Sequence, residues 1–216
     1  RTTHVPYFAL RDFRAGINQE VEEALLRALR GQQYILGEEV DAFENEFAAY
    51  VQASMAIGVG NGYDALVVAL KTAGIGAGDE VILPANTFIA TVNAVVQVGA
   101  LPVLAEPDPY TCNLTSSEAA AHVTSRTKAI IPVHLYGQAC EMKGFLELAG
   151  QHNLAIIEDF AQAQGASYKG RPVGSFGRIS ATSFYPTKNL GALGDGGAVV
   201  TSDPELAAYA RMYRHY

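Results

Sequence analysis

Residues 129–158 read AIIPVHLYGQACEMKGFLELAGQHNLAIIE, and this stretch decides the fold. Its two ends, residues 129–133 and 155–158, are short apolar runs of the length expected for buried β-strands. Between them, residues 142–151 place apolar side chains at helical spacing. Strands that alternate with helices and are continuously apolar indicate a mostly parallel sheet that is covered on both faces.

The same alternation extends along most of the chain. Further strands are expected at residues 56–59, 80–83, 102–105, 179–184 and 198–201, and further helices at residues 18–30, after Gly37, at 64–73 and at 87–98. This pattern predicts an N-terminal segment followed by one large α/β domain, together covering residues 1–216. Ligands of such sheets bind beyond the carboxyl ends of the strands, so the residues that follow each strand are the candidates for function.

Composition excludes several classes of function. The chain has 216 residues, of which 49% are hydrophobic and 17% charged, and a formal net charge of −7. Phosphate-rich nucleic acid binds to basic faces, so a nucleic-acid role is not expected. No run of about 18 apolar residues predicts a membrane span, and the N-terminus has no apolar core of signal-peptide length. Cys112 and Cys140 share no metal-ligand spacing, so we expect a cytoplasmic protein without a metal.

The first strand-end site is glycine-rich: residues 58–66 read GVGNGYDAL between an expected strand and an expected helix. Backbone N–H groups at the start of a helix favour an anion such as phosphate, and glycines allow close approach. The alternative is a tight turn that requires positive φ. A dinucleotide-binding turn is excluded, because the sixth position of G-x-G-x-x-G is Tyr63 and no acidic ribose partner follows the next strand.

The second and third sites are an acid and a lysine. Residues 156–163 read IIEDFAQA, where an apolar strand runs directly into Asp159; the alternatives are a cofactor contact or a cap of the next segment. Residues 182–191 read TSFYPTKNLG, where Lys188 follows a strand that bears hydroxyl groups. A lysine that forms an imine must lose its proton, which a partly desolvated site promotes, whereas an ordinary lysine is solvated at the surface.

Taken in order, the three motifs resemble the DegT/DnrJ/EryC1/StrS family of aminotransferases, which act on nucleotide sugars and use pyridoxal 5′-phosphate (PLP). Residues 5–10 (VPYFAL), 84–91 (PANTFIAT) and 132–138 (PVHLYGQ) add to the resemblance. It implies the aspartate-aminotransferase fold, known as fold type I, which is a three-layer domain with a mostly parallel sheet. It also implies a homodimer with a shared active site. The small C-terminal domain of the family is expected to be absent from this chain.

The resemblance assigns the cofactor contacts by position. Lys188 forms the Schiff base and then moves protons, Asp159 pairs with the protonated ring nitrogen, and Gln162 hydrogen-bonds the phenolic oxygen. The phosphate is held by Gly62, Tyr63 and the hydroxyl of Ser183, and Phe88 stacks on the ring. The family often carries Thr or Ser where Tyr63 stands, so a backbone contact is expected there.

Substrate contacts are expected from His134, Tyr185 and Asn189, with a satisfied strand-end histidine as the alternative for His134. Residues 188–197 (KNLGALGDGG) resemble the branch that aminates C3. The expected reaction is transamination of a dTDP-3-keto-6-deoxyhexose, with glutamate as the amino donor. The alternatives are a 4-keto-sugar aminotransferase and a PLP-binding regulator without turnover. A sugar dehydratase of the same fold is disfavoured, because such relatives replace the lysine by histidine.

Overall fold

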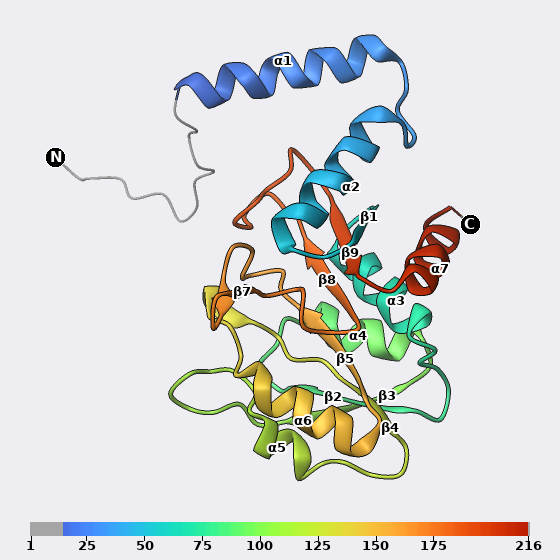
Figure 1. Cartoon of the computed structure of the whole chain (residues 1–216), viewed down its shortest axis with the longest axis vertical. Helices are drawn as coiled ribbons and strands as arrows, with labels where there is room; N and C mark the ends of the chain where they lie inside the picture. The colour runs from blue at the N-terminus through green and yellow to red at the C-terminus, as the bar shows by residue number, and fades with distance from the viewer. Residues whose placement is uncertain (1–14, 216) are drawn as a thin grey trace, which may run out of the picture. The chain divides into compact units, whose positions relative to one another are not determined.

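The computed structural model describes residues 15–215, so the resemblance at residues 5–10 lies outside the described residues. The chain divides into two compact units, of which the first ends at Phe43 and the second begins at Glu44. The first unit contains α1 (Ala15–Gly31) and the start of α2 (Glu38–Val51). The second unit contains the end of α2 and all of the sheet, and the candidate site belongs to it (Figure 1).

The second unit is built on a seven-stranded sheet in the order β1-β9-β8-β5-β4-β2-β3. The strands are β1 (Met55–Val59), β2 (Glu80–Pro84), β3 (Leu101–Ala105), β4 (Thr127–Ile130), β5 (Ala155–Asp159), β8 (Ile179–Ser183) and β9 (Gly197–Thr201). Neighbouring strands from β3 to β8 pair in parallel, and β9 pairs antiparallel with both β8 and β1. The predicted α/β fold with a mostly parallel sheet is therefore confirmed.

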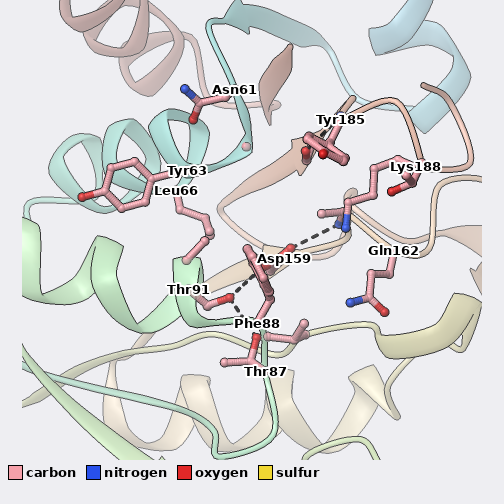
Figure 2. A pocket seen from close by; sticks show the side chains of 16 residues that line it. Asn61, Tyr63, Leu66, Thr87, Phe88, Thr91, Asp159, Gln162, Tyr185 and Lys188 are labelled. Carbon is pink, nitrogen blue, oxygen red and sulfur yellow. Dashed lines mark hydrogen bonds between the residues drawn. The ribbon is translucent and has the colours of Figure 1, made fainter. Parts of the chain in front are cut away.

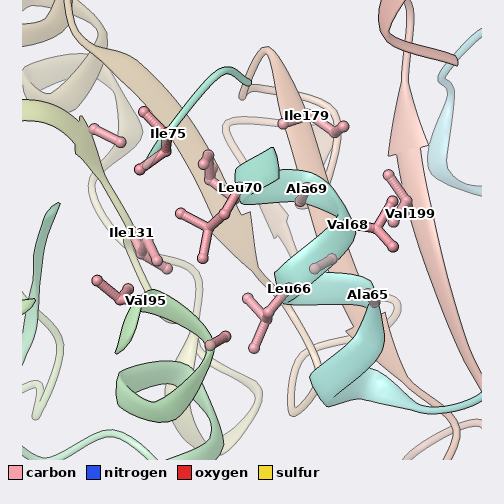
Figure 3. Packing of buried hydrophobic residues seen from close by; sticks show 14 of the residues in the cluster. Ala65, Leu66, Val68, Ala69, Leu70, Ile75, Val95, Ile131, Ile179 and Val199 are labelled. Atoms are coloured by element: carbon pink, nitrogen blue, oxygen red, sulfur yellow. The ribbon is translucent and has the colours of Figure 1, made fainter. Parts of the chain in front are cut away.

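Helices cover both faces of this sheet, because successive side chains of each strand point to opposite faces. Ile157 packs in the cluster with α3 (Gly62–Thr72), α4 (Ile89–Gln97) and α7 (Pro204–Arg214). Figure 3 shows Leu70 of α3 and Val95 of α4 in this cluster. Ile156, which precedes Ile157, packs in the cluster with α5 (Ser116–Ala120) and α6 (Met142–His152). Burying each such side chain contributes roughly 1.5–3 kcal/mol, so the alternation of two apolar faces holds the three layers together.

Two predictions of local structure were wrong. The strand expected at residues 129–133 is regular only over Thr127–Ile130, because Pro132 has no N–H for the ladder. The chain still follows β5, since Asp159 N–H donates to Pro132 O at 3.0 Å and His134 N–H donates to Asp159 O at 3.0 Å. The helix expected at residues 87–98 begins only at Ile89, after a turn in which Thr87 N–H donates to Pro84 O.

Helix α5 and a short hairpin are among the elements that were not expected. Helix α5 is capped by Thr115, whose hydroxyl accepts from Glu118 N–H at 3.2 Å, so the T-x-x-E pattern was an available signal. A hairpin joins β6 (Ser167–Tyr168) to β7 (Arg171–Pro172). Both strands have only two residues, which is too short for a periodic pattern.

The edge strand β1 is closed by side chains instead of another strand. The N–H of Gly58 donates to Glu44 Oε1 at 2.8 Å, and its carbonyl accepts from Arg214 Nη1 at 3.4 Å. Glu44 and Arg214 also form an ion pair with each other. An unpaired edge invites pairing with another chain, so this pair protects the strand that leads into the glycine-rich turn.

Two glycines allow the glycine-rich turn to lie against β8 and β9. A Cβ at Gly62 would lie 2.4 Å from Ser183 Cβ, and one at Gly197 would lie 2.3 Å from the carbonyl oxygen of Asn61. Gly58, Gly60 and Gly62 all lack positive φ, so the alternative of a turn that requires it does not hold. Close backbone approach is the reason for glycine here.

We expect Gly197→Ala to destabilise the protein by about 3 kcal/mol, because the new methyl group meets backbone atoms that cannot rotate away. Gly150→Ala is the matched control, since nothing lies within 4 Å of its Cβ position in α6. A helix-interior glycine replaced by alanine gains up to about 1 kcal/mol. Chemical denaturation would measure both variants, and equal stability of the two would contradict the packing argument.

Candidate functional site

A cavity of about 410 Å³ lies at the carboxyl ends of the strands. It is lined by Asn61, Gly62, Tyr63, Leu66, Thr87, Phe88, Ala90, Thr91, Val133, Asp159, Ala161, Gln162, Ser183, Tyr185, Thr187 and Lys188. These residues come from five segments: the start of α3, the turn into α4 with its first helical turn, the chain that follows β4, the end of β5 with the residues after it, and the end of β8 with the loop after it. The volume falls within the usual range for small-ligand pockets.

Asp159 places a nearly buried carboxylate in the wall of this cavity. It is the last residue of β5, and its side chain is on the face covered by α3 and α4. Burial raises the pKa of Asp159, and hydrogen bonds from Ala161 and Thr91, with the nearby charge of Lys188, offset only part of that rise. A carboxylate in this position favours a cationic partner, which would restore the ionised form.

Two threonines of the turn into α4 orient the acid. Thr91 Oγ1 donates to Asp159 Oδ2 at 2.9 Å, and Thr91 in turn pairs with Thr87 Oγ1 at 2.8 Å (Figure 2). The other carboxylate oxygen accepts from Ala161 N–H at 3.2 Å. An ionised carboxyl group has about four acceptor sites, so Asp159 keeps capacity for a donor from the cavity.

The start of α3 offers a place for an anion. Asn61 caps the helix by accepting from Asp64 N–H at 2.8 Å, and its amide donates back to Asp64 Oδ2 at 2.8 Å. The N–H groups of Gly62 and Tyr63 belong to the first turn, where a helix supplies no acceptor. Ser183 Oγ accepts from Tyr185 N–H at 3.2 Å, which leaves its own proton to donate. A small anion would find these donors together with the positive end of the helix dipole.

Lys188 extends from the loop after β8 into the cavity toward Asp159 (Figure 2). The turn that carries it is closed by Lys188 N–H, which donates to Tyr185 O at 2.8 Å. Amine and carboxylate therefore face the same space from strands β8 and β5, which are neighbours in the sheet. A nucleophilic amine beside a buried acid is suited to hold a carbonyl compound that also carries a basic nitrogen.

Gln162, Phe88 and Tyr185 also line the cavity. Gln162 Oε1 accepts from Tyr136 N–H at 3.1 Å, so its amide N–H groups are the ones left to donate. Phe88 is 67% exposed and Tyr185 is 54% exposed, so both rings keep free faces toward the solvent side. Large exposed aromatic rings at a cavity are suited to cover a flat ligand.

The side chain of Tyr63 points away from Asp159 and Lys188 (Figure 2). Its ring packs against the core cluster under α3. Of this residue, the backbone N–H in the first turn of α3 is the group left for an anion, and a backbone contact there stays a prediction.

His134 does not line the cavity, which disagrees with its predicted role in a sugar pocket. It is fully buried; its Nδ1 accepts from Cys140 N–H at 2.9 Å, and its Nε2 pairs with Glu158 Oε2 at 3.1 Å. Because Nδ1 accepts a proton donor, Nε2 carries the proton and donates to Glu158. The alternative of a satisfied strand-end histidine is the one that this geometry supports.

Asn189 is also outside the cavity. It is exposed, one residue beyond Lys188, and does not belong to the lining. The prediction for Asn189 rested on its neighbour in the sequence, and consecutive residues of a loop point in different directions.

Four polar lining residues were missed by sequence reasoning: Asn61, Thr87, Thr91 and Thr187. A signal existed for Thr87 and Thr91, which stand four apart around the turn into α4, within a segment already matched to the family. Residues four apart on a helical turn share one face, so the pair could have been placed beside Phe88. Asn61 precedes the expected helix and has the side chain of an N-cap.

Within residues 15–215, no group of three or more His, Cys, Asp or Glu side chains is placed to hold a metal ion. No helix in the same range is long and apolar enough to cross a membrane. Cys112 and Cys140 are both free thiols. Burial and the nearby charge of Glu158 raise the pKa of Cys140 to about 12, so this thiol is not an activated nucleophile.

Comparison with known proteins matches residues 15–216 to the model of the DegT/DnrJ/EryC1/StrS aminotransferase family. A dTDP-3-amino-3,4,6-trideoxy-alpha-D-glucose transaminase of Streptomyces venezuelae is 48% identical over 215 residues, which cover 100% of this chain and 57% of the relative. A pleiotropic regulatory protein of Geobacillus stearothermophilus is 46% identical over 211 residues, which cover 98% of this chain and 57% of the relative. This chain thus spans little more than half of each.

Among solved structures, the crystal structure of DesV from S. venezuelae in complex with a ketimine intermediate superposes with a TM-score of 0.91. The two chains are 50% identical, and the match covers 93% of this chain and 54% of that one. At 50% identity, the two chains resemble each other in sequence as well as in fold.

We expect Asp159→Asn to stabilise the ligand-free protein at pH 8, because the neutral amide removes the cost of a buried charge. The raised pKa means that this cost is absent below the unfolded-state value of about 3.9 and grows as pH rises through the folded-state pKa. The gain in melting temperature over wild type should therefore be small near pH 4.5 and larger at pH 8.

Thermal denaturation of the ligand-free protein at both pH values measures this difference in melting temperature. Glu147→Gln makes the same chemical change on the exposed surface of α6, with the side chain 60% exposed, and should shift the melting temperature little at either pH. A lower melting temperature for Asp159→Asn than for wild type at pH 8 would contradict the burial argument.

Proposed function

The chain belongs to the DegT/DnrJ/EryC1/StrS aminotransferase family, and on that premise we propose that it is the cofactor-binding part of a PLP-dependent aminotransferase acting on a nucleotide-linked keto sugar. The observation that carries the proposal is the placement of Lys188 and Asp159 in the wall of one cavity, together with the free N–H groups at the start of α3. Membership of the family alone would not place these groups together.

The residues of the cavity fit PLP. The cofactor has a basic ring nitrogen, an aldehyde, a phenolic oxygen and a phosphate, and each finds a complementary group. Asp159 has acceptor capacity for a protonated nitrogen, and Gln162 has N–H groups for the phenolic oxygen. A Cβ at Gly62 would lie 3.0 Å from Ser183 Oγ, so only glycine leaves the hydroxyl and the helix start together for a phosphate. Lys188 would hold the aldehyde carbon through its ε-amino group.

When bound, PLP withdraws electrons from the carbon that bears the amine, so that a proton on that carbon becomes acidic. Asp159 would keep the ring nitrogen protonated, and Thr91 would keep the acid oriented by its hydrogen bond of 2.9 Å. As a free amine, Lys188 would accept a proton at Nζ from one atom of the reacting molecule and donate it to a neighbouring atom of that molecule. Phe88 would exclude water from one face of the ring. The N–H groups of Gly62 and Tyr63 would hold the phosphate.

The substrate that the sequence favours is a dTDP-3-keto-6-deoxyhexose, with glutamate as the amino donor and a 3-amino sugar as the product. Two facts support it: the S. venezuelae relative is named for a dTDP-3-amino sugar, and residues 188–197 resemble the branch that aminates C3. Tyr185 borders the cavity beside the lysine, where the sugar would enter. Because a misplacement of about 1 Å can cost on the order of 100-fold in rate, the shape of this loop is suited to select the carbon that reacts.

For the cofactor, we expect borohydride reduction of the wild-type protein loaded with PLP to leave a pyridoxyl group on Lys188, and Lys188→Ala to abolish it. Mass spectrometry of the digested protein locates the adduct. Lys169→Ala is the matched control, because this lysine lies over the ring of Tyr168, away from the cavity, and its loss should leave the adduct intact. An adduct on Lys169 or Lys71 in the wild type would remove Lys188 from its role.

For the substrate, we expect the product amine at C3. The protein is supplied with glutamate and, in separate reactions, with a dTDP-3-keto- and a dTDP-4-keto-6-deoxyhexose, and NMR locates the new amine. Amination of the 4-keto sugar alone would overturn the choice of carbon and leave the cofactor assignment intact. A protein that captures PLP at Lys188 but aminates neither sugar would favour the second candidate, a regulator without turnover, for which the Geobacillus relative's name speaks.

A further inference from the structure

We propose that Gln164 is a positioning residue that fixes the orientation of the lysine loop, residues 184–192, and thereby the place of Lys188 in the cavity. Gln164 itself does not line the cavity. The inference rests on the proposed function, because it assumes that Lys188 is the residue that holds PLP. It adds a role for a buried side chain that no sequence motif assigned.

Gln164 joins two parts of the site through one amide group. It is 7% exposed; its Nε2 donates to Thr182 Oγ1 at 2.9 Å and to Ser183 O at 2.7 Å. Its Oε1 accepts from Leu190 N–H at 2.9 Å. A carbonyl can only accept and a backbone N–H can only donate, so these partners fix which end of the amide is nitrogen. One side of the group is therefore bound to β8 and the other to the lysine loop.

The lysine loop is closed on itself and would move as one body. Ala192 N–H donates to Phe184 O at 2.7 Å, and Lys188 N–H donates to Tyr185 O at 2.8 Å. A Cβ at Gly191 would lie 2.4 Å from Pro186 O, so the two limbs of the loop are in contact. In the described part of the chain, the hydrogen bond that Leu190 N–H donates to Gln164 is the only one that joins residues 186–191 to a residue outside the loop.

This geometry makes Gln164 the link between two walls of the cavity. It stands two residues after Gln162, in the segment that leaves Asp159 at the end of β5. Its amide holds the backbone at Ser183, beside the start of α3, and the backbone two residues beyond Lys188. Without this bond the loop would keep its internal contacts but lose its fixed angle to β8, and Lys188 would no longer be held in place.

The test compares Gln164→Met, which has similar size and no hydrogen bonds, with Gln164→Glu, which keeps an oxygen to accept from Leu190 N–H. Gln151→Met is the matched control on the exposed surface of α6. Two properties are measured on the protein from which PLP has been removed. The first is the rate of covalent capture of PLP, in which Lys188 Nζ bonds to the aldehyde carbon and the aldehyde oxygen leaves as water. The second is the affinity for pyridoxamine phosphate, which has no aldehyde and cannot be captured.

We expect Gln164→Met to slow capture by roughly 10- to 100-fold, the order of loss that a misplaced reacting group produces. Its affinity for pyridoxamine phosphate should stay within about 3-fold of wild type, because that ligand depends on the other contacts. Gln164→Glu should capture faster than Gln164→Met, and Gln151→Met should match wild type in both measurements.

Three results would overturn the inference: unchanged capture in Gln164→Met, an equal loss of capture and of pyridoxamine phosphate affinity, or a Gln164→Glu variant no faster than Gln164→Met. The second would mean that the substitution disturbs the whole site instead of the loop. Failure of the proposed function is distinguishable, because then the wild-type protein itself would not capture PLP at Lys188.

Discussion

Two consecutive carboxylates at the end of β5 must be buried on opposite faces of one sheet, and much of the second unit is arranged to allow this. Glu158 is fully buried and accepts from His134 and Ser180 side chains and from the N–H groups of Gly174, Phe176 and Gly177. Burial raises the pKa of Glu158, but these hydrogen bonds outweigh it, so the net pKa lies below its usual value. These five hydrogen bonds stabilise the ionised carboxylate within the structure, and those from Gly174, Phe176 and Gly177 hold the loop before β8 in place.

Asp159 has fewer hydrogen-bond donors than Glu158, and it lies in the wall of the candidate site. It has two hydrogen-bond donors where its neighbour has five, and burial keeps its pKa raised. A buried carboxylate with spare acceptor capacity is costly unless a ligand completes it. The fold tolerates this cost at the carboxyl edge of the sheet, where the side chain faces a cavity. One strand thus contributes a structural acid to one face and a site acid to the other.

The parallel sheet explains why the other site groups meet Asp159. Parallel strands end at the same edge, so the start of α3, the turn into α4 and the lysine loop all meet there although they are far apart in the sequence. Glycines at positions 62 and 197 then allow backbone segments to approach to distances that any side chain would prevent. The fold supplies the common edge, and small residues and buried amides such as Gln164 set the spacing within it.

Sequence alone determined the fold class, and it predicted Asp159 and Lys188 as site residues, both of which line one cavity. Apolar strands separated by helices predict a mostly parallel sheet covered by helices, and an acid at the end of one strand and a lysine in the loop after another are expected at its carboxyl edge. Periodicity says which residues are buried, and this was sufficient for Asp159 and Lys188. It was also sufficient for the start of α3, because a glycine-rich turn before a helix has a local physical meaning.

Only the tertiary structure decided how the remaining polar residues are used. His134 follows an apolar strand as Asp159 does, but it faces the opposite side of the sheet and pairs with Glu158. Thr91 is far from Asp159 in the sequence, yet its hydroxyl orients the acid. Gln162 and Gln164 differ by two positions, and one lines the cavity while the other ties the lysine loop to β8. A hydrogen bond depends on where both partners lie, and long-range placement is not encoded in the local pattern around either one.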